Sequence, residues 1–350
     1  CVLPAGAGEH LPSVALARCD AVVSLRHRDQ VVDYEAADLT MVAQCGATLR
    51  HLDTVVAAEN QSLAVDCARG SRATVGGAVS RNRVGLDSLR FGNWRDHVLG
   101  ARVMHADGTV TQTGSRVVKS VSGYDLAKLY VGSQGSLVFL LDVNLRLLSR
   151  LQTSKTVRAS LPHAAVAEVL QALHDDRSLH PSSLLVVAQP HMPRQAGHVD
   201  VVARFAGREE VVHQQLERCQ KSLGGQILDD DAAELLANQL RQQSAPKTGK
   251  PWMQVLALPV GILSTVLDCA PELDAQSGFV AQYGVGVAHF VFSPETESAL
   301  RHVQKQVDPT QARFVWGNGQ ETEAPEAAAS AALLKLQRSI HNSFDAHGVL

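Results

Sequence analysis

The chain has 350 residues, of which 45% are hydrophobic and 19% are charged, so it has the composition and length of about two globular domains. Its formal net charge of −3 and its aromatic content of 4% argue against nucleic-acid binding, which needs a basic face and stacking residues. No apolar run approaches the roughly 20 residues of a membrane span, and the six cysteines are too widely spaced for a C-x-x-C motif. We therefore expect a cytoplasmic protein without a transmembrane segment.

The first part of the chain has the pattern of short strands and tight turns. Strands are predicted at residues 20–25, 31–36, 39–46 and 139–148. A helix is expected from Thr48, whose hydroxyl can cap its first turn, and Asp107-Gly108 predicts a hairpin over residues 97–114. Apolar and polar residues alternate along 139–148, which is typical of a strand with one buried and one exposed face. This strand is expected to close a first domain, residues 1–150.

After residue 150, helices and strands alternate in longer units. Helices are predicted at residues 163–176, 208–225, 261–269 and 296–306, and strands at 183–189, 198–205, 252–258, 278–284 and 285–292. A closing helix is predicted over residues 327–344. The pattern predicts an α+β fold, with a second domain at residues 151–325 and a C-terminal segment, residues 326–350, that returns to the first domain.

Three glycine-rich segments in the first domain indicate a function. They are VLPAGAGEHLP at residues 2–12, GSRATVGGAVSRNRVG at residues 70–85, and the GSQGS turn within residues 123–148. Glycine lets a ligand approach the backbone closely, and unpaired N–H groups at a loop or helix start favour a phosphate. Each segment alone could be an ordinary turn, but three of them in one domain together favour a phosphate-binding site.

Several stretches of the chain carry a family resemblance. They are Pro4, Gly6 and Gly8, with GSRATVGG, RDHVLGARVMHADGTV, RVVKSVSGYDLAKLYVGSQGSL and LQRSIHNSFDAHGVL. They resemble the FAD-binding domains of the vanillyl-alcohol oxidase and p-cresol methylhydroxylase (PCMH) type, and within these the FAD-binding subunits of bacterial glycolate oxidases. The resemblance implies a two-subdomain PCMH-type FAD-binding domain, truncated at its N-terminus, followed by an α+β cap domain.

The resemblance also implies which residues hold the cofactor. A non-covalently bound FAD would lie between the two domains, with its diphosphate over the small-residue loops. The implied FAD-binding residues are Pro4, Ala5, Gly6, Ala7, Gly8, Thr74, Val75, Gly76, Gly77, Ser80, Arg81, Gly132, Ser133, Gly135 and Val138. The residues at 5–8 and 74–77 would offer N–H groups to the diphosphate, and those at 132–138 would line the adenosine or ribityl portion.

Few residues are candidates for the chemistry itself. Relatives of this fold carry an H-x-G-D-G-N-x-H metal stretch where this chain reads QYGVGVAHFVF, and His289 alone cannot build a metal site. Tyr124, Asp125 and Lys128 are candidates for proton or carboxylate chemistry. The alternative is that Asp125 caps the short helix, Tyr124 packs near the flavin edge and Lys128 is exposed.

The combined interpretation is an FAD-binding subunit of a glycolate-oxidase-like complex that acts on a small 2-hydroxy acid. The implied partners are a homologous catalytic FAD subunit and an iron–sulfur subunit, through which the protein could be peripheral at the inner membrane. Its role would be electron relay or assembly. The alternatives are a self-sufficient FAD-dependent 2-hydroxy-acid dehydrogenase, a scaffold without flavin, and an NADPH-using reductase of the same fold.

Overall fold

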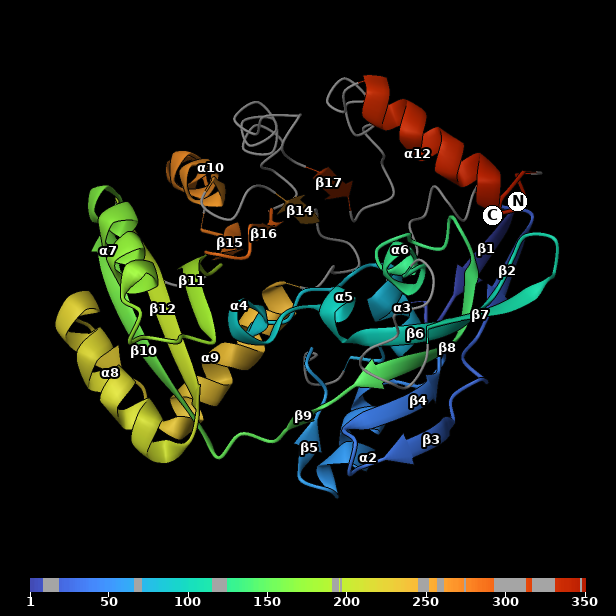
Figure 1. The fold of residues 1–350 in the computed structure, drawn as a ribbon. Coiled ribbons are helices and arrows are strands. Elements are labelled where there is room, and N and C mark those ends of the chain that lie inside the picture. Colours follow the sequence, from blue (N-terminus) through green and yellow to red (C-terminus); the bar gives the residue numbers. More distant parts are fainter. Residues whose placement is uncertain are drawn as a thin grey trace. The chain divides into compact units, whose positions relative to one another are not determined.

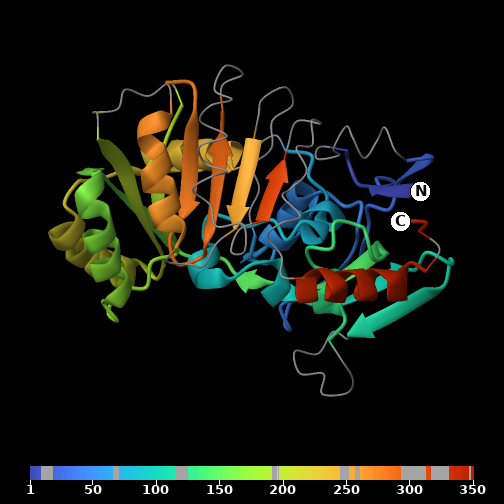
Figure 2. The same cartoon turned by 90° about the horizontal axis from the view of Figure 1, so that it is seen from above.

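A computed structural model describes most of the chain. The described residues are 1–8, 19–65, 71–114, 125–190, 195, 197–244, 252–256, 261–273, 275–292, 313–316, 331–346 and 348–350. The chain forms two compact units, drawn in Figure 1 and turned by 90° in Figure 2. Unit 1 comprises Cys1–Gly85, Gly92–Arg150 and Ser330–Leu350, and unit 2 comprises Leu86–Phe91 and Leu151–Ala329. Both units combine helices with largely antiparallel sheets, which confirms the predicted α+β class.

The main sheet in the described part of unit 1 has five antiparallel strands in the order β3-β4-β8-β6-β7 (Figure 1). Its strands are β3 (Val31–Glu35), β4 (Thr40–Gln44), β6 (Val98–Met104), β7 (Val110–Gly114) and β8 (Phe139–Arg146). The predicted hairpin is confirmed as β6 and β7. Its turn contains Gly108 at a φ of +84°, which only glycine adopts without a steric penalty.

Shorter elements complete the described part of unit 1. Strand β1 (Val2–Ala5) runs parallel to β2 (Ala21–Ser24), and β5 (Gln61–Ser62) pairs with β9 (Leu148–Ser149). The helices are α2 (Leu49–Ala57), α3 (Val75–Ser80), α5 (Trp94–His97), α6 (Ala127–Tyr130) and α12 (Ala331–Phe344). As predicted, Thr48 caps α2, because its Oγ1 accepts the N–H of His51 at 3.2 Å. The N–H of Val2 donates to the carbonyl oxygen of Val349 at 2.5 Å, which joins the C-terminal residues to β1.

Strand β8 differs from the prediction, because both of its faces are buried. It lies inside the sheet between β4 and β6. Asp142 and Asn144, which the alternation placed on an exposed face, are 5% and 6% exposed. Arg28 and Arg102 each donate to one carboxylate oxygen of Asp142. Since a buried carboxylate requires such partners, Asp142 reflects pairing inside the protein and not contact with water.

The described part of unit 2 is built on an eight-stranded sheet in the order β13-β10-β12-β11-β15-β16-β14-β17. Its strands are β10 (Thr153–Pro162), β11 (Ser183–Ala188), β12 (His198–Gly207), β13 (Gln226–Ile227), β14 (Trp252–Leu256), β15 (Gly278–Gln282), β16 (Val287–Val291) and β17 (Arg313–Trp316). The helices are α4 (Ser88–Phe91), α7 (His163–Asp175), α8 (Glu209–Leu223), α9 (Asp230–Gln243) and α10 (Ile262–Cys269), which continues into a 3-10 turn at Ala270–Glu272.

Helices cover both faces of this sheet. Apolar residues of α7, α8 and α10 cluster with Leu184 and Val186 of β11, whereas those of α9 cluster with Leu185 and Val187. Because alternate residues of a strand point to opposite faces, the two clusters lie on opposite sides of the sheet. Burial on both faces explains why β11 is a continuous apolar run in the sequence.

Most of the elements predicted in the second half of the chain are confirmed. Helix α8 ends before Gly224, as expected, and this glycine has a φ of +69°. Strand β10 and helix α9 were not predicted, although the side chain of Asp229 caps α9 by accepting the N–H of Ala232 at 2.8 Å. The predicted helix at 296–306 and residues 327–330 of the closing helix lie outside the described residues.

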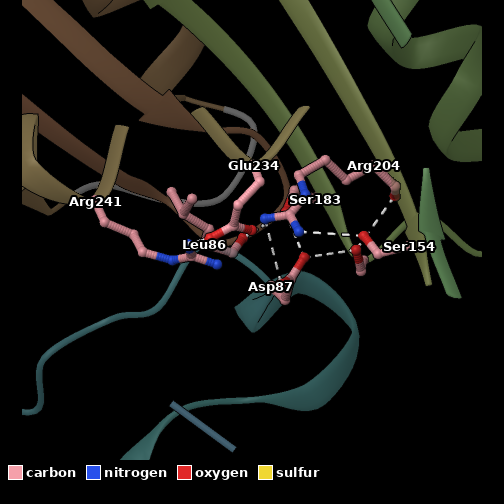
Figure 3. A network of polar contacts seen from close by, with 8 residues as sticks. Leu86, Asp87, Ser154, Ser183, Arg204, Glu234 and Arg241 are labelled. Atoms are coloured by element: carbon pink, nitrogen blue, oxygen red, sulfur yellow. Dashed lines mark hydrogen bonds and ion pairs between the residues drawn. The ribbon is translucent and has the colours of Figure 1, made fainter. Parts of the chain in front are cut away.

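The segment Leu86–Phe91 is held in unit 2 by a polar network (Figure 3). The hydroxyl of Ser182 donates to Oδ1 of Asp87 at 2.6 Å, and Oγ of Ser183 lies 2.7 Å from the carbonyl oxygen of Leu86. Nη1 of Arg204 lies 3.5 Å from Oδ2 of Asp87. Asp87 and Arg204 are thus the ionic centre of this anchor.

Candidate cofactor site

The first glycine segment follows β1 and lies against the start of α3. A Cβ atom on Gly6 would lie 2.1 Å from Oγ1 of Thr74, so this close approach requires glycine. The carbonyl oxygen of Gly6 accepts the hydroxyl of Ser24 at 3.3 Å. Gly8 has a φ of +79°, a left-handed conformation that glycine adopts readily. The backbone of this segment is therefore fixed against both α3 and β2.

The second glycine segment forms the start of α3. Oγ1 of Thr74 caps the helix by accepting the N–H of Gly77 at 3.3 Å. The N–H groups of Val75 and Gly76 donate to backbone carbonyl oxygens at 2.8 and 2.9 Å. These three N–H groups, which the resemblance implied as donors to the diphosphate, thus already have acceptors within the protein.

The third glycine segment follows α6 and contacts the other two. The N–H groups of Gly132 and Gln134 donate to carbonyl oxygens at the end of α3, at 3.1 and 2.8 Å. Gly135 has a φ of +82°, and a Cβ atom there would lie 2.5 Å from Cγ of Pro4. The three segments, distant in sequence, therefore meet at one place in unit 1.

The backbone donors of the first segment differ from those of the other two. Within the described part of the chain, the N–H groups of Gly6, Ala7 and Gly8 donate no hydrogen bond to the protein. A diphosphate needs donors that the fold has not already used, and a loop of consecutive backbone N–H groups can supply them. The first segment therefore fits a dinucleotide diphosphate, and the other two segments fit the role of its support.

Arginines beside α3 supply positive charge to this region. Arg81 directly follows the helix, and burial lowers the pKa of its guanidinium below the ordinary value. Nη1 of Arg83 is buried and has no hydrogen-bond acceptor among the described residues. A buried guanidinium nitrogen that lacks an acceptor is costly unless an anionic group is present, so this residue also fits a diphosphate.

The other residues implied from the sequence belong to β1, to α3 and to the chain between α6 and β8. Ala5 is buried at the end of β1, and Ser80 is half-buried at the end of α3. The hydroxyl of Ser133 donates to the carbonyl oxygen of Tyr130 at 2.8 Å. Val138 is buried in the hydrophobic core directly before β8. The side chains of Ser133 and Val138 thus both have partners within the protein.

Lys128 is built into the fold. Its Nζ donates to the carbonyl oxygens of Arg95 and Val98, the latter at 2.8 Å. Burial lowers the pKa of this lysine. The N-cap of α6 is Leu126, and no side chain caps this helix, so Asp125 does not have the capping role. The expectations of an exposed Lys128 and a capping Asp125 are both wrong. The lysine is half-buried and joins α6 to α5 and to the start of β6.

The remaining candidates for the chemistry give little further information. Tyr124 lies outside the described residues. His289 is buried in β16. In the described ranges, no group of three or more His, Cys, Asp or Glu side chains is arranged to hold a metal ion. Among the helices that the structure describes, none combines the length and the apolar character needed to cross a membrane.

A family comparison covers the part of the chain that holds the first two glycine segments. Residues 1–114 match the sequence family described as FAD binding domain. The match agrees with the PCMH-type resemblance and supports FAD as the expected cofactor.

Several curated proteins are similar to the chain. It is 32% identical over 161 residues to the glycolate oxidase subunit GlcD of Bacillus subtilis, which covers 45% of this chain and 34% of the relative. It is 27% identical over 207 residues to a D-2-hydroxyglutarate dehydrogenase of Stutzerimonas stutzeri, with coverages of 58% and 44%. It is 28% identical over 158 residues to a D-lactate dehydrogenase of Archaeoglobus fulgidus, with coverages of 45% and 35%. The chain thus spans less than half the length of these curated relatives.

Solved structures resemble nearly the whole chain. A xylooligosaccharide oxidase from Myceliophthora thermophila superposes with a TM-score of 0.69 at 14% identity, covering 99% of this chain and 84% of that protein. An alkyldihydroxyacetonephosphate synthase superposes with a TM-score of 0.68 at 13% identity, covering 99% and 72%. At such low identity these likenesses concern the fold alone, and they confirm its class.

Proposed function

We propose that the protein is an FAD-dependent oxidoreductase component that acts on 2-hydroxy acids and binds FAD non-covalently. The main observation in support is that the N–H groups at Gly6–Gly8 lack protein acceptors among the described residues. These groups lie at the place where the three glycine segments meet. The family match at residues 1–114 supports FAD as the ligand of these groups. The relatives named for glycolate, D-lactate and D-2-hydroxyglutarate support the substrate class, because all three compounds are 2-hydroxy acids.

In this proposal the residues of unit 1 have distinct tasks. The N–H groups at Gly6–Gly8 hold the oxygens of the diphosphate, and Arg81 and Arg83 offset its negative charge. The segments at 74–77 and 132–138 keep the first segment in place through their backbone contacts. When bound, FAD supplies the acceptor for the two electrons that a 2-hydroxy acid loses on oxidation to a 2-oxo acid.

Two forms of this function are open to test. In the first, the protein is a subunit beside a homologous catalytic FAD subunit and an iron–sulfur subunit, in the cytoplasm or peripheral at a membrane through those partners. The glycolate oxidase relative is itself named as a subunit, which supports this form. Because the six cysteines are widely spaced, an iron–sulfur cluster in this form would belong to the partner. In the second, the protein is a self-sufficient dehydrogenase, which the names of the two dehydrogenase relatives favour.

The test of FAD binding is a titration of the purified protein with FAD. Binding is expected to quench the fluorescence of FAD and to leave a yellow protein after gel filtration. Acid precipitation is expected to release the flavin into the supernatant, because the attachment is non-covalent. A protein that stays colourless and leaves FAD fluorescence unchanged would contradict the proposal.

Anaerobic addition of substrate separates the two forms. Bleaching of the bound flavin by glycolate or D-lactate in the isolated protein identifies the self-sufficient dehydrogenase. Bleaching that requires a co-purified flavoprotein identifies the subunit. Bleaching by NADPH, with no response to any 2-hydroxy acid in either preparation, would overturn the substrate class.

A further inference from the structure

A buried carboxylate connects two parts of unit 1 that are distant in sequence. Asp142 lies in β8, the central strand of the sheet, and is 5% exposed. Its Oδ1 accepts from Nη2 of Arg28 at 2.9 Å, and its Oδ2 accepts from Nε of Arg102 at 2.5 Å. Arg102 belongs to the neighbouring strand β6, whereas Arg28 lies in a turn outside the sheet. The same aspartate therefore holds one strand and one turn.

The turn at Leu25–Arg28 contacts the first glycine segment. It is closed by the N–H of Arg28, which donates to the carbonyl oxygen of Leu25 at 2.8 Å. The N–H of Leu25 donates to the carbonyl oxygen of Ala5 at 2.8 Å, directly before Gly6. The preceding residue, Ser24, donates its hydroxyl to the carbonyl oxygen of Gly6. The position of the turn thus determines where the backbone of Gly6 lies.

The turn also contacts the support of the second glycine segment. The N–H of Gly46 donates to the carbonyl oxygen of Arg28 at 2.8 Å. A Cβ atom on Gly46 would lie 1.9 Å from the carbonyl oxygen of Leu25, so the two backbones are in direct contact. The carbonyl oxygen of the preceding residue, Cys45, accepts the N–H of Gly76 at 2.9 Å. Backbone contacts thus hold the turn on two sides, and the ion pair of Arg28 is its side-chain anchor.

We propose that Asp142 and Arg28 are positioning residues for FAD. Their ion pair fixes the Leu25–Arg28 turn, and the turn directs the N–H groups at Gly6–Gly8 toward the diphosphate. The carboxylate of Asp142 is buried although Arg28 is partly exposed, so the loss of the arginine leaves a buried charge less compensated. Such a pair is suited to fixing the geometry of a loop. This inference rests on the proposed FAD site, and it adds two residues that the sequence did not identify.

Arg102 is the matched control that the structure offers. It contacts the same carboxylate, and its side chain is 44% exposed against 36% for Arg28. It differs in that its backbone belongs to the sheet and not to the turn. If Asp142 only stabilises unit 1, the loss of either arginine has the same consequence. If Asp142 positions the cofactor loop, FAD affinity responds to Arg28 alone.

The test compares Arg28→Ala and Arg102→Ala by FAD affinity, urea unfolding and amide hydrogen exchange of the full chain. Arg28→Ala is expected to raise the Kd for FAD at least about tenfold, or about 1.4 kcal/mol, and to speed exchange at the Leu25 and Gly46 amides. Arg102→Ala is expected to lower stability but to change the Kd by less than about twofold. Arg28→Lys keeps the charge and is expected to restore part of the affinity.

The outcomes separate this inference from the function on which it rests. Equal losses of FAD affinity in the two alanine variants would overturn the positioning role and leave FAD binding intact. Unchanged exchange at Leu25 and Gly46 in Arg28→Ala would overturn it as well. Wild-type protein that binds no FAD would refute the proposed function, and the exchange measurement would still decide whether Arg28 fixes the turn. Should Arg28→Ala fail to fold, the comparison of Arg28→Lys with Arg102→Lys takes its place.

Discussion

Units 1 and 2 use their polar groups differently. At the first glycine segment of unit 1, N–H groups lack protein acceptors among the described residues, although the segment is fixed by close contacts with Thr74 and Ser24. Around Asp87 in unit 2, polar side chains mainly contact one another and hold the segment Leu86–Phe91. Rigid backbone with free donors can bind a ligand, whereas mutually bound side chains contribute to stability. Ligand affinity and folding stability should therefore respond to different residues.

The largest effect is expected from Gly6→Ala. The new Cβ atom would lie 2.1 Å from Oγ1 and 3.1 Å from Cβ of Thr74, so the segment must move away from α3. We expect the Kd for FAD to rise by about 100-fold, or about 2.7 kcal/mol, in a fluorescence titration. The control is Gly108→Ala, because a Cβ atom on this positive-φ glycine would meet nothing within 4 Å, and it should leave the Kd unchanged. Normal FAD binding by Gly6→Ala would contradict the proposal that the backbone of the first glycine segment binds the cofactor.

A stability effect without an affinity effect is expected from Arg204→Ala. The side chain of Arg204 is 8% exposed, and its loss removes the cation beside Asp87. Because Ser182 and Ser183 still donate to Asp87, the loss in unfolding free energy should be about 2 kcal/mol. The measurement is urea unfolding, with Lys155→Ala as the control. Lys155 pairs with the exposed Asp230 and should cost less than about 1 kcal/mol. An Arg204→Ala variant that folds fully but loses FAD would show that unit 2 also governs cofactor affinity.

A smaller effect is expected from Thr74→Ala. The substitution removes the cap of α3, so the unfolding free energy should fall by about 1 kcal/mol. The Kd for FAD should rise by less than about threefold, because the N–H groups of the second segment already have acceptors within the protein. Thr74→Ser keeps the accepting oxygen and should behave like the wild type. A large loss of affinity with unchanged stability would instead make Thr74 a direct ligand of the cofactor.

The smallest effect concerns acid stability in unit 2. Hydrogen bonds from Ser178 and Arg218 lower the pKa of Asp176 from 3.8 to about 2. Because the folded value lies below the unfolded one, the contribution is present above about pH 4 and is lost as the pH falls through about 2. The stability gap between the wild type and Asp176→Asn should therefore shrink as the pH falls from about 5 to about 2. Glu168→Gln, on the exposed side of α7, is the control. A difference in stability between the wild type and Asp176→Asn that widens in acid would contradict a lowered pKa for Asp176.

Local signals in the sequence predicted much of the fold. The cap of α2 at Thr48, the turn at Asp107-Gly108 and the stop of α8 at Gly224 each depend on a few neighbouring residues, and all three are confirmed. The hydrogen-bond acceptors of the N–H groups at the start of α3 could not be predicted in the same way. The N–H groups of Val75 and Gly76 donate to carbonyl oxygens that precede α3 by many residues, so nothing within GSRATVGG shows that these two groups are occupied.

Long-range pairing also explains what the sequence did not show about β8. Its alternating pattern is that of a half-exposed strand, yet Asp142 is buried between Arg28 and Arg102. No local pattern reveals which arginine meets which aspartate. The cofactor segments could be named from their glycines, because close backbone approach leaves a mark in the sequence. The ion pair that we propose to position them leaves no such mark.

The excursion of Leu86–Phe91 into unit 2 bears on any attempt to express half of the protein. The chain leaves unit 1 after Gly85, re-enters it at Gly92, leaves again after Arg150 and re-enters at Ser330. A fragment ending at residue 150 would carry Leu86 without its apolar neighbours and Asp87 without its arginine. Neither unit can thus be separated by a single cut in the chain, and the segment Leu86–Phe91 is expected to need both units in one polypeptide in order to pack.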